Sequence, residues 1–284
     1  MSLHRLATRA TRVAARFRGD YGIDAADALC HFDLAERLGI VVRLVALPSL
    51  EGMYSPGPMP TILVNAERPV GRRRYNCGHE LGHHLFGHGT RLDEIADDGT
   101  AAWGPEELTA QRFAAALLMP KLAVEVAFAR RGWRVSAPNP ECVLIVAQNL
   151  GVGYSTLVGH LQRTLRLMPS TSADVLRRAS LPSLRSRLAG FKVDHDLVVV
   201  DEHWGRRPID IEVGDIVLLP KGAAFEGVCA ELHTQPVQHL KAALPGIGAL
   251  ALAGNRPPIP VRVSRRGFIG LARYRHLEEA ADDR

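Results

Sequence analysis

Four histidines lie within ten positions of the stretch YNCGHELGHHLFGHG, residues 75–89, and a glutamate directly follows the first of them. Residues four apart share one face of a helix, so His79 and His83 can direct a ring nitrogen at one metal ion. Glu80, next to the first histidine, is then placed to take a proton from the water that the ion activates. This HExxH spacing predicts a metal site that hydrolyses peptide bonds.

A third ligand has to come from elsewhere in the chain, and a carboxylate suits the place. Two neutral imidazoles and one carboxylate leave the fourth position of Zn²⁺ open for water. The next helical segment offers Glu106 and Glu107, whose helical angles flank its apolar face, so periodicity does not choose between them. Small residues on that face, among them Ala110 and Ala114, would let the two helices approach closely. The alternative is that both acids only complement the helix dipole.

A second histidine pair, His84 and His88, is also spaced by four but lies about 140° around the same helix from the first pair. It cannot share the ion of the first pair, so we expect these rings either to be solvated or to contact the ligands from outside. Hydrolysis also needs a donor to the oxyanion, and Tyr54 is a candidate. Four further histidines have no ligand spacing: His195, His203, His233 and His239.

The elements that must position these residues follow from hydrophobic periodicity and from proline and glycine. Pro69 stands where the histidine helix can begin and Gly89 where it can stop. A strand at 61–65 precedes this helix, and Pro105 and Pro120 bracket the next one. The remaining elements expected in this half are helices at 3–17 and 25–38, a strand at 40–47 and two helices between 140 and 167.

From about Leu197 the pattern changes to short β-like runs separated by glycine and proline. We therefore predict an α+β fold. A zincin-like peptidase domain, with a small sheet and helices, would occupy residues 1–168, and a smaller β-rich domain would occupy residues 190–284. The boundary would lie between residues 169 and 190.

Composition and charge narrow the class of protein. The 284 residues are 46% hydrophobic and 23% charged, which is typical of a globular chain. The net charge of +5 is small for this length, so nucleic-acid binding has weak support. Five arginines within residues 1–20 argue against a signal peptide, and no apolar run is long enough for a bilayer, so we expect a cytoplasmic protein without a membrane partner. The cysteines lack CxxC spacing and are expected to be reduced: Cys30, Cys77, Cys142 and Cys229.

One stretch resembles a DNA-binding motif. Within residues 141–165, VAQNLGVGYSTLVGHLQRTL has the pattern of a helix, a glycine-containing turn and a second helix. The alternative is a helical pair that completes the peptidase domain, which the many apolar and few basic positions favour. If the motif binds DNA, the residues facing it would be Tyr154, Ser155, Thr156 and Arg163.

The blocks ILVN, RRRYNCGHELGHHLFGH and EELTAQRFAAALLMP together resemble the ImmA/IrrE family of metallo-endopeptidases over about residues 20–165. The resemblance implies that Glu107, three residues before Ala110, is the third ligand beside His79 and His83. It implies Zn²⁺, although nitrogen and oxygen ligands also accept Mn²⁺. The departures from the family pattern leave all ligands intact: Cys77 and Gly78 where Leu-Ala is usual, and Gln111 where Asn is common.

Family members cut helix-turn-helix repressors, often encoded beside them, in response to DNA damage, stress or mobile-element signals. The resemblance therefore implies a repressor as protein substrate, and a sensory or regulatory role for the C-terminal domain. Two other hypotheses stay open: a DNA-binding regulator in which the metal is structural, and an interaction protein with a vestigial site. A closed structural site would have a fourth protein ligand. The presence of Glu80 disfavours the vestigial site.

Overall fold

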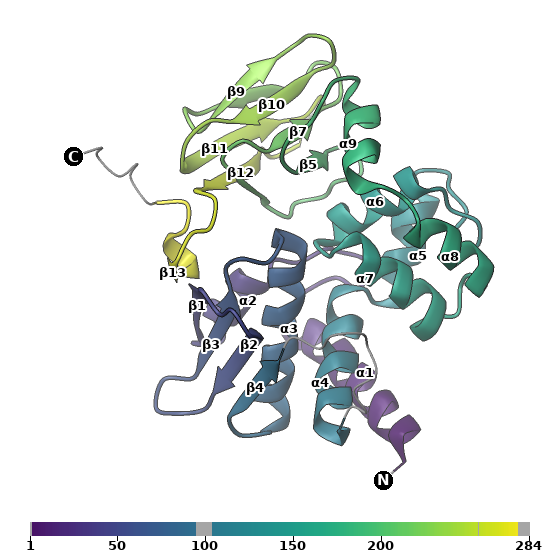
Figure 1. Cartoon of the computed structure of the whole chain (residues 1–284), viewed down its shortest axis with the longest axis vertical. Coiled ribbons are helices and arrows are strands. Elements are labelled where there is room, and N and C mark those ends of the chain that lie inside the picture. The colour runs from purple at the N-terminus through teal and green to yellow at the C-terminus, as the bar shows by residue number, and fades with distance from the viewer. Residues whose placement is uncertain (1, 95–103, 255, 278–284) are drawn as a thin grey trace. The chain divides into compact units, whose positions relative to one another are not determined.

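The computed structural model describes residues 2–94, 104–254 and 256–277 (Figure 1). Residues 278–284 of the predicted C-terminal domain lie outside this range. The chain divides into two compact units. The first contains Met1–Val126, Leu150–Gly153 and Ile269–Arg273, and the second contains Ala127–Asn149, Tyr154–Phe268 and Tyr274–Arg284. The units do not coincide with the predicted ranges 1–168 and 190–284, which stay a prediction.

The first unit combines helices with one mixed sheet. Its helices are α1 (Leu3–Asp20), α2 (His31–Arg37), α3 (Val70–Phe86) and α4 (Pro105–Leu118). Its strands are β1 (Val41–Val45), β2 (Leu50–Ser55), β3 (Thr61–Asn65), β4 (Arg91–Glu94) and β13 (Gly270–Leu271). Helix α5 (Lys121–Ala129) follows α4 and crosses the division between the units.

The sheet has the strand order β13-β1-β3-β2-β4. Strands β1 and β3 are parallel, and the other neighbours are antiparallel. Helix α3 lies against β2 and β3 (Figure 1). Apolar residues alternate along β1 and β3 and form a buried face: Val42, Leu44, Ile62 and Val64. This period of two is the reason that these segments form strands. The far edge is closed by β13, in which Gly270 pairs with Leu44.

Helices α1, α3 and α4 pack together because each buries one face. Helix α1 buries Ala10, Ala14 and Phe17, which recur at helical spacing. Helix α4 packs against both α1 and α3. The predicted starts of α3 after Pro69 and of α4 at Pro105 are confirmed. The predicted end of α3 is wrong: the helix ends at Phe86, before the predicted stop, because Gly87 adopts a left-handed φ of 66°.

The predicted helix at 25–38 is also wrong over its first half, since α2 contains only His31–Arg37. The Asp24 carboxylate accepts a hydrogen bond from the Ala26 backbone N–H at 2.8 Å, which favours a turn. The buried guanidinium of Arg18 donates to the carbonyl oxygens of Asp24 and Asp27. These contacts hold the segment outside a helix.

The second unit contains helices and two four-stranded sheets. Its helices are α6 (Pro140–Leu150, except the last residue), α7 (Tyr154–Gly159), a π-helical turn (His160–Thr164), α8 (Ser170–Arg177) and α9 (Leu181–Ala189). One sheet has the order β5 (Leu197–Val199), β7 (Ile216–Leu218), β10 (His239–Ala242), β9 (Ala230–His233). The other has the order β6 (Ile209–Glu212), β12 (Ile259–Ser264), β11 (Gly246–Ala251), β8 (Ala224–Glu226).

One hydrophobic core contains residues of both sheets. Val217 and Leu240 come from the first sheet, Leu250 and Val261 from the second, and all four are fully buried. The fold is therefore α+β, with a β-rich C-terminal region, as predicted. The two helices expected between residues 140 and 167 are also present. The four cysteines are buried and form no disulfide with one another.

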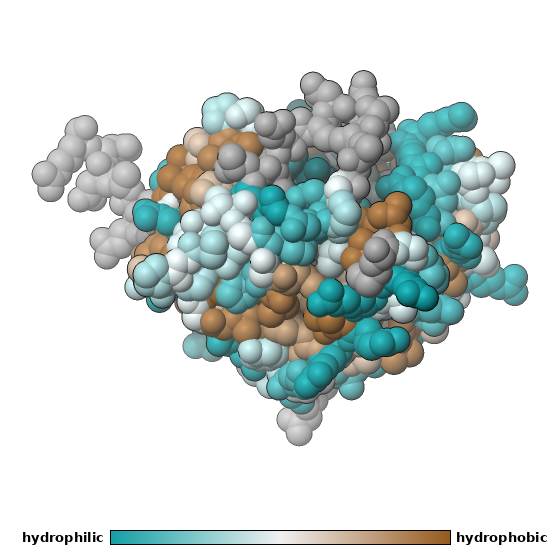
Figure 2. Space-filling model, turned by 90° about the horizontal axis from the view of Figure 1, so that it is seen from below, coloured by the Kyte–Doolittle hydropathy of each residue, from teal (hydrophilic) through white to brown (hydrophobic). Residues whose placement is uncertain are grey.

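Among the described residues, no single helix has the length and hydropathy needed to cross a membrane. The segments Pro140–Leu150 and Tyr154–Thr164 meet these criteria only when joined, and they are bent by 102° at the break between them. Figure 2 shows the protein from below, and on this face hydrophobic residues are interspersed with hydrophilic ones.

Candidate metal centre

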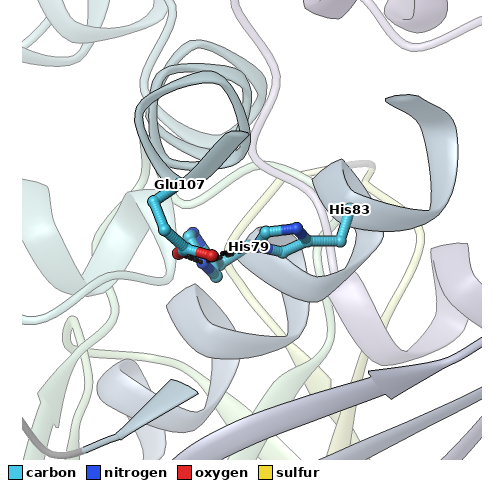
Figure 3. A group of neighbouring side chains, drawn as sticks. All are labelled: His79, His83 and Glu107. Carbon is cyan, nitrogen blue, oxygen red and sulfur yellow. Dashed lines mark hydrogen bonds and ion pairs between the residues drawn. The ribbon is translucent and has the colours of Figure 1, made fainter. Parts of the chain in front are cut away.

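Two neighbouring helices bring three side chains together. His79 and His83 point from α3, and Glu107 points toward them from the first turn of α4 (Figure 3). His79 Nε2 lies 3.1 Å from His83 Nε2 and 3.2 Å from Glu107 Oε2. His83 Nε2 lies 3.4 Å from Glu107 Oε1. The three side chains thus present one nitrogen each from two imidazoles and a carboxylate oxygen to a common point.

These separations are compatible with a tetrahedral metal ion. Ligand atoms about 2.05 Å from zinc, at tetrahedral angles, lie about 3.3 Å from one another. The two nitrogens are 3.1 Å apart, and each lies 3.2 or 3.4 Å from one of the two Glu107 oxygens, which is close to this value. Within the described part of the chain, these three residues form the group of histidine and acidic side chains with the spacing to hold a metal. The donor set and the geometry therefore both suit Zn²⁺.

Burial and charge also suit a cation. The side chain of His83 is fully buried, whereas that of Glu107 is 36% exposed, so the carboxylate lies on the accessible side of the group. Hydrogen bonds from His79, which has the larger effect, and from His83 hold the pKa of Glu107 well below its usual range. The carboxylate is therefore anionic at neutral pH and supplies the negative charge that a divalent ion needs.

Small residues let the two helices approach, as expected from the alanines of α4. A Cβ placed on Gly82 would lie 2.9 Å from Ala110 Cα, which is closer than side chains tolerate. One turn earlier, a Cβ on Gly78 would lie 3.8 Å from Ala114 Cβ, in ordinary contact. This close approach brings Glu107 within reach of the histidines.

The two acids at the start of α4 have different partners. Glu107 faces the histidines, whereas Glu106 forms an ion pair with Arg91 on β4. Sequence periodicity alone left the choice open, and the structure places Glu107 at the metal group. Both side chains of the Arg91–Glu106 pair are partly exposed, so the pair contributes about 0–1 kcal/mol to stability.

Glu80 is fully buried beside strand β2. A Cβ on Gly52 would lie 2.6 Å from Glu80 Oε1, so a larger residue at this position would have to displace the carboxylate. The pairing of β2 with β4 shifts register between Leu50 and Gly52. Such irregularities often re-aim groups next to active sites. The role of Gly52 was not predicted, because the sequence around it does not indicate a strand.

A polar cluster holds β2 against α3 beside this glycine. Glu51 accepts a hydrogen bond from the Asn76 side chain at 2.7 Å. Its carboxylate also lies 3.3 Å from the guanidinium nitrogens of both Arg68 and Arg72. Because Asn76 precedes Glu80 by one helical turn, these contacts fix the part of β2 that borders the Glu80 carboxylate.

Tyr54 lies on strand β2, two residues after Gly52 and on the same face. Its hydroxyl is 2.9 Å from His84 Nδ1. Burial raises the pKa of Tyr54 and lowers the pKa of His84, so both side chains are neutral near pH 7. His84 is therefore not a solvated side chain. The role of Tyr54 as an oxyanion donor stays a prediction.

The predicted position of His88 is wrong. We expected it on the helix, far around from the ligands, but α3 ends at Phe86. The left-handed Gly87 turns the chain back, and His88 Nδ1 lies 3.0 Å from His83 Nδ1. Burial, and then the charge of His83, lower the pKa of His88 to about 4. His88 is therefore neutral and contacts a predicted ligand from outside.

The candidate DNA-binding segment has the interhelical bend of a helix-turn-helix, since 102° lies within the usual range of about 90–120°. However, the prediction that Tyr154 faces DNA is wrong. Tyr154 is 6% exposed, and its hydroxyl donates to the Leu176 carbonyl oxygen at 2.9 Å. Ser155 and Arg163 are exposed and Thr156 is partly exposed. DNA binding stays a prediction.

Comparison with known proteins agrees with this description. Residues 35–160 match the family model described as the IrrE N-terminal-like domain, Peptidase_M78. The matched segment includes the whole of α3 and α4. No curated protein sequence matches the chain. The resemblance drawn from the three sequence blocks is thus confirmed at the level of the family.

Proposed function

We propose that this chain, whose residues 35–160 match the IrrE N-terminal-like peptidase family, is a zinc-dependent endopeptidase that cleaves a helix-turn-helix transcriptional repressor. The observation that carries the proposal is the convergence of His79, His83 and Glu107 in one group, beside the buried carboxylate of Glu80. The repressor would be encoded near this protein and would act in a stress, DNA-damage or mobile-element response.

His79 and His83 would hold the zinc through Nε2 and Glu107 through a carboxylate oxygen. When bound, zinc supplies Lewis acidity toward a peptide carbonyl and toward water. Three protein ligands would leave one position of a four-coordinate zinc for a reactant, and Glu107 forms the accessible side of the group. Mn²⁺ suits the same donors, because nitrogen and oxygen ligands discriminate weakly between the two ions.

Glu80 would act as the general base and then as the general acid. Its carboxylate accepts a proton from the attacking water and delivers it to the nitrogen of the leaving amine. Glu80 follows His79 directly, but its carboxylate lies against Gly52 and outside the three-residue group. It is therefore available for proton transfer without serving as a ligand. Tyr54 is our candidate for the oxyanion donor.

The substrate class is supported by the family resemblance and not by a contact in the protein. The test is to incubate the purified protein with each helix-turn-helix regulator encoded near it. We expect wild type to cleave one of them. Glu80→Gln should bind as much zinc but cleave roughly 10²–10⁴-fold more slowly, because a positioned base contributes about that factor. Glu106→Gln, which changes a neighbouring acid outside the group, should cleave at the wild-type rate.

The main alternative is a DNA-binding regulator whose metal is structural. In that case Glu80→Gln would leave the regulatory effect intact, since an amide of the same size preserves packing around the site. A reporter under control of the cleaved repressor, in cells carrying wild type or Glu80→Gln, separates the two functions. If the variant binds zinc and still derepresses like wild type, the peptidase proposal is wrong.

A further inference from the structure

We propose that His88 is a positioning residue for the metal centre: it fixes His83 in the tautomer whose Nε2 lone pair faces the ion. This inference rests on the proposed function, because it takes His83 as a ligand. His88 itself lies outside the three-residue group. Its contact is with the outer nitrogen of His83, at 3.0 Å between the two Nδ1 atoms.

The contacts of His83 determine where its proton must be. A neutral imidazole has one nitrogen that donates and one that accepts. Nε2 of His83 faces His79 Nε2 at 3.1 Å and the Glu107 carboxylate at 3.4 Å, so this is the nitrogen available to a metal. A ligating nitrogen carries no proton, and His83 must therefore be protonated at Nδ1. His88 Nδ1 then accepts a hydrogen bond from the Nδ1–H of His83, and the proton of the His88 ring is on its Nε2.

The backbone places His88 where this bond forms. Gly87, with φ of 66°, reverses the chain at the end of α3, and the His88 N–H donates to the His83 carbonyl oxygen at 3.1 Å. His88 is thus hydrogen-bonded through its backbone to the residue whose ring it contacts. Gly89, with φ of 72°, follows at once and lets the chain turn toward β4.

An aromatic neighbour holds the plane of the His88 ring. Phe86 stacks on His88 with ring centroids 5.7 Å apart and an interplanar angle of 19°. Phe86 is itself held by an edge contact with Phe113 of α4 at 6.0 Å and by the Arg9 guanidinium 5.5 Å from its centroid. Phe86, and through it the plane of the His88 ring, is therefore held by contacts from α1 and α4.

Full burial makes the hydrogen bond of His83 important. The His83 side chain is inaccessible to solvent, so water cannot easily replace a protein acceptor at Nδ1. His84, its neighbour in sequence, directs its own Nδ1 at Tyr54. His88 therefore provides the acceptor that metal-binding histidines usually have on the nitrogen opposite the metal.

Two substitutions separate the hydrogen bond from the ring. His88→Phe keeps an aromatic ring against Phe86 but removes the acceptor. His88→Asn removes the ring but keeps an oxygen acceptor close to the position of Nδ1. We expect zinc affinity, measured by chelator competition, to fall about 10–100-fold in His88→Phe, the usual effect of losing such a partner. His88→Asn should recover most of that loss.

A second measurement follows the proton itself. In the zinc-loaded full chain, the His83 Nδ1 proton, assigned with His83→Gln, should resonate downfield, as a hydrogen-bonded ring proton does, in wild type and in His88→Asn. In His88→Phe it should move upfield. If His88→Phe binds zinc like wild type, or His88→Asn binds as weakly as His88→Phe, the proposal is wrong. If wild type binds no zinc, the proposed function fails; if wild type binds zinc and the His88 variants do not differ from it, only the role of His88 fails.

Discussion

Gly82 of α3 and Ala110 of α4 are in contact through their backbones: a Cβ on Gly82 would lie 2.9 Å from the Cα and 3.1 Å from the carbonyl oxygen of Ala110. Gly82 directly precedes His83, and Ala110 follows Glu107 by three residues. The contact therefore sets the distance between ligands that come from different helices. The geometry of the metal group therefore depends on the absence of a side chain at Gly82.

Gly82→Ala should weaken zinc binding. The added methyl group would overlap with the backbone of Ala110, which can move only if α4 shifts as a whole. Such a shift would carry Glu107 away from the histidines. Overpacking of this kind destabilises by about 1–3 kcal/mol. Zinc affinity by chelator competition and the thermal midpoint of the zinc-free protein are the measurements.

Gly78→Ala is the matched control for this prediction. Its Cβ would meet its nearest neighbour, His31, at 3.4 Å, an ordinary contact. Both substitutions add the same methyl group to α3 and gain the same helix propensity, up to about 1 kcal/mol. Equal zinc affinity in the two variants would show that the close approach of the helices does not position Glu107.

Gly52→Ala should impair proton transfer without removing the metal. The new Cβ would overlap with Glu80 Oε1, at 2.6 Å, and displace the carboxylate, while His79, His83 and Glu107 keep their places. A displacement of about 1 Å can lower a rate by about 10²-fold. Cleavage rate and zinc content are measured together. Gly57→Ala, whose Cβ would meet nothing within 4 Å, should change neither, and a fully active Gly52→Ala would contradict the assignment of Glu80 as the base.

Replacing each of the two acids of α4 by glutamine tests which of them is the third ligand. Glu107→Gln should lower zinc affinity, because a neutral amide replaces the anionic ligand. Glu106→Gln should keep the metal and lose only the partly exposed pair with Arg91, about 0–1 kcal/mol of stability. Elemental analysis and chelator competition measure the first effect, and urea unfolding measures the second. The reverse pattern would assign the ligand to Glu106.

Tyr154 should make the folded protein sensitive to alkali. Burial raises its pKa to about 12, from the ordinary value of 10.0. Between these pH values the unfolded chain loses the phenol proton while the folded chain keeps it, so the free energy of unfolding falls as pH rises, by up to about 2 kcal/mol. Below pH 10 this contribution is fully present.

Tyr154→Phe should remove this alkaline loss. It also removes the hydrogen bond to Leu176, so the variant should be about 1 kcal/mol less stable at pH 8. Urea unfolding at pH 8 and pH 11 gives the difference. Tyr274→Phe, at a half-exposed tyrosine, serves as the control. The same pH dependence in wild type and Tyr154→Phe would contradict the prediction.

The helices of the site could be predicted because local signals specify them. Pro69 and Pro105 start α3 and α4, and the spacing of His79 and His83 depends only on helical geometry. The α+β class follows from the change of pattern near Leu197. The choice of Glu107 required either the family resemblance or the structure, since both acids border the same face.

The missed features depend on contacts between segments distant in sequence. Strand β2 contains Gly52 and Glu51, residues that strands disfavour, and it forms because β3 and β4 pair with it. The contact of His88 depends on Gly87, whose left-handed φ ends the helix. From the sequence, Gly89 was the predicted end, and the pattern alone does not choose between the two glycines. The burial of Tyr154 depends on α8, a helix that the sequence reading did not place.

The pairing of β13 with β1 has a consequence for the order of events on the ribosome. Gly270 and Leu271 complete a sheet whose other strands all lie before residue 95. N-terminal segments generally fold first during synthesis. Here the backbone groups on the outer edge of β1 cannot pair with β13 until Gly270 and Leu271 have been translated and have emerged from the ribosome. The sheet that supports α3, the helix of His79 and His83, is therefore finished late, after almost all of the second unit has been made.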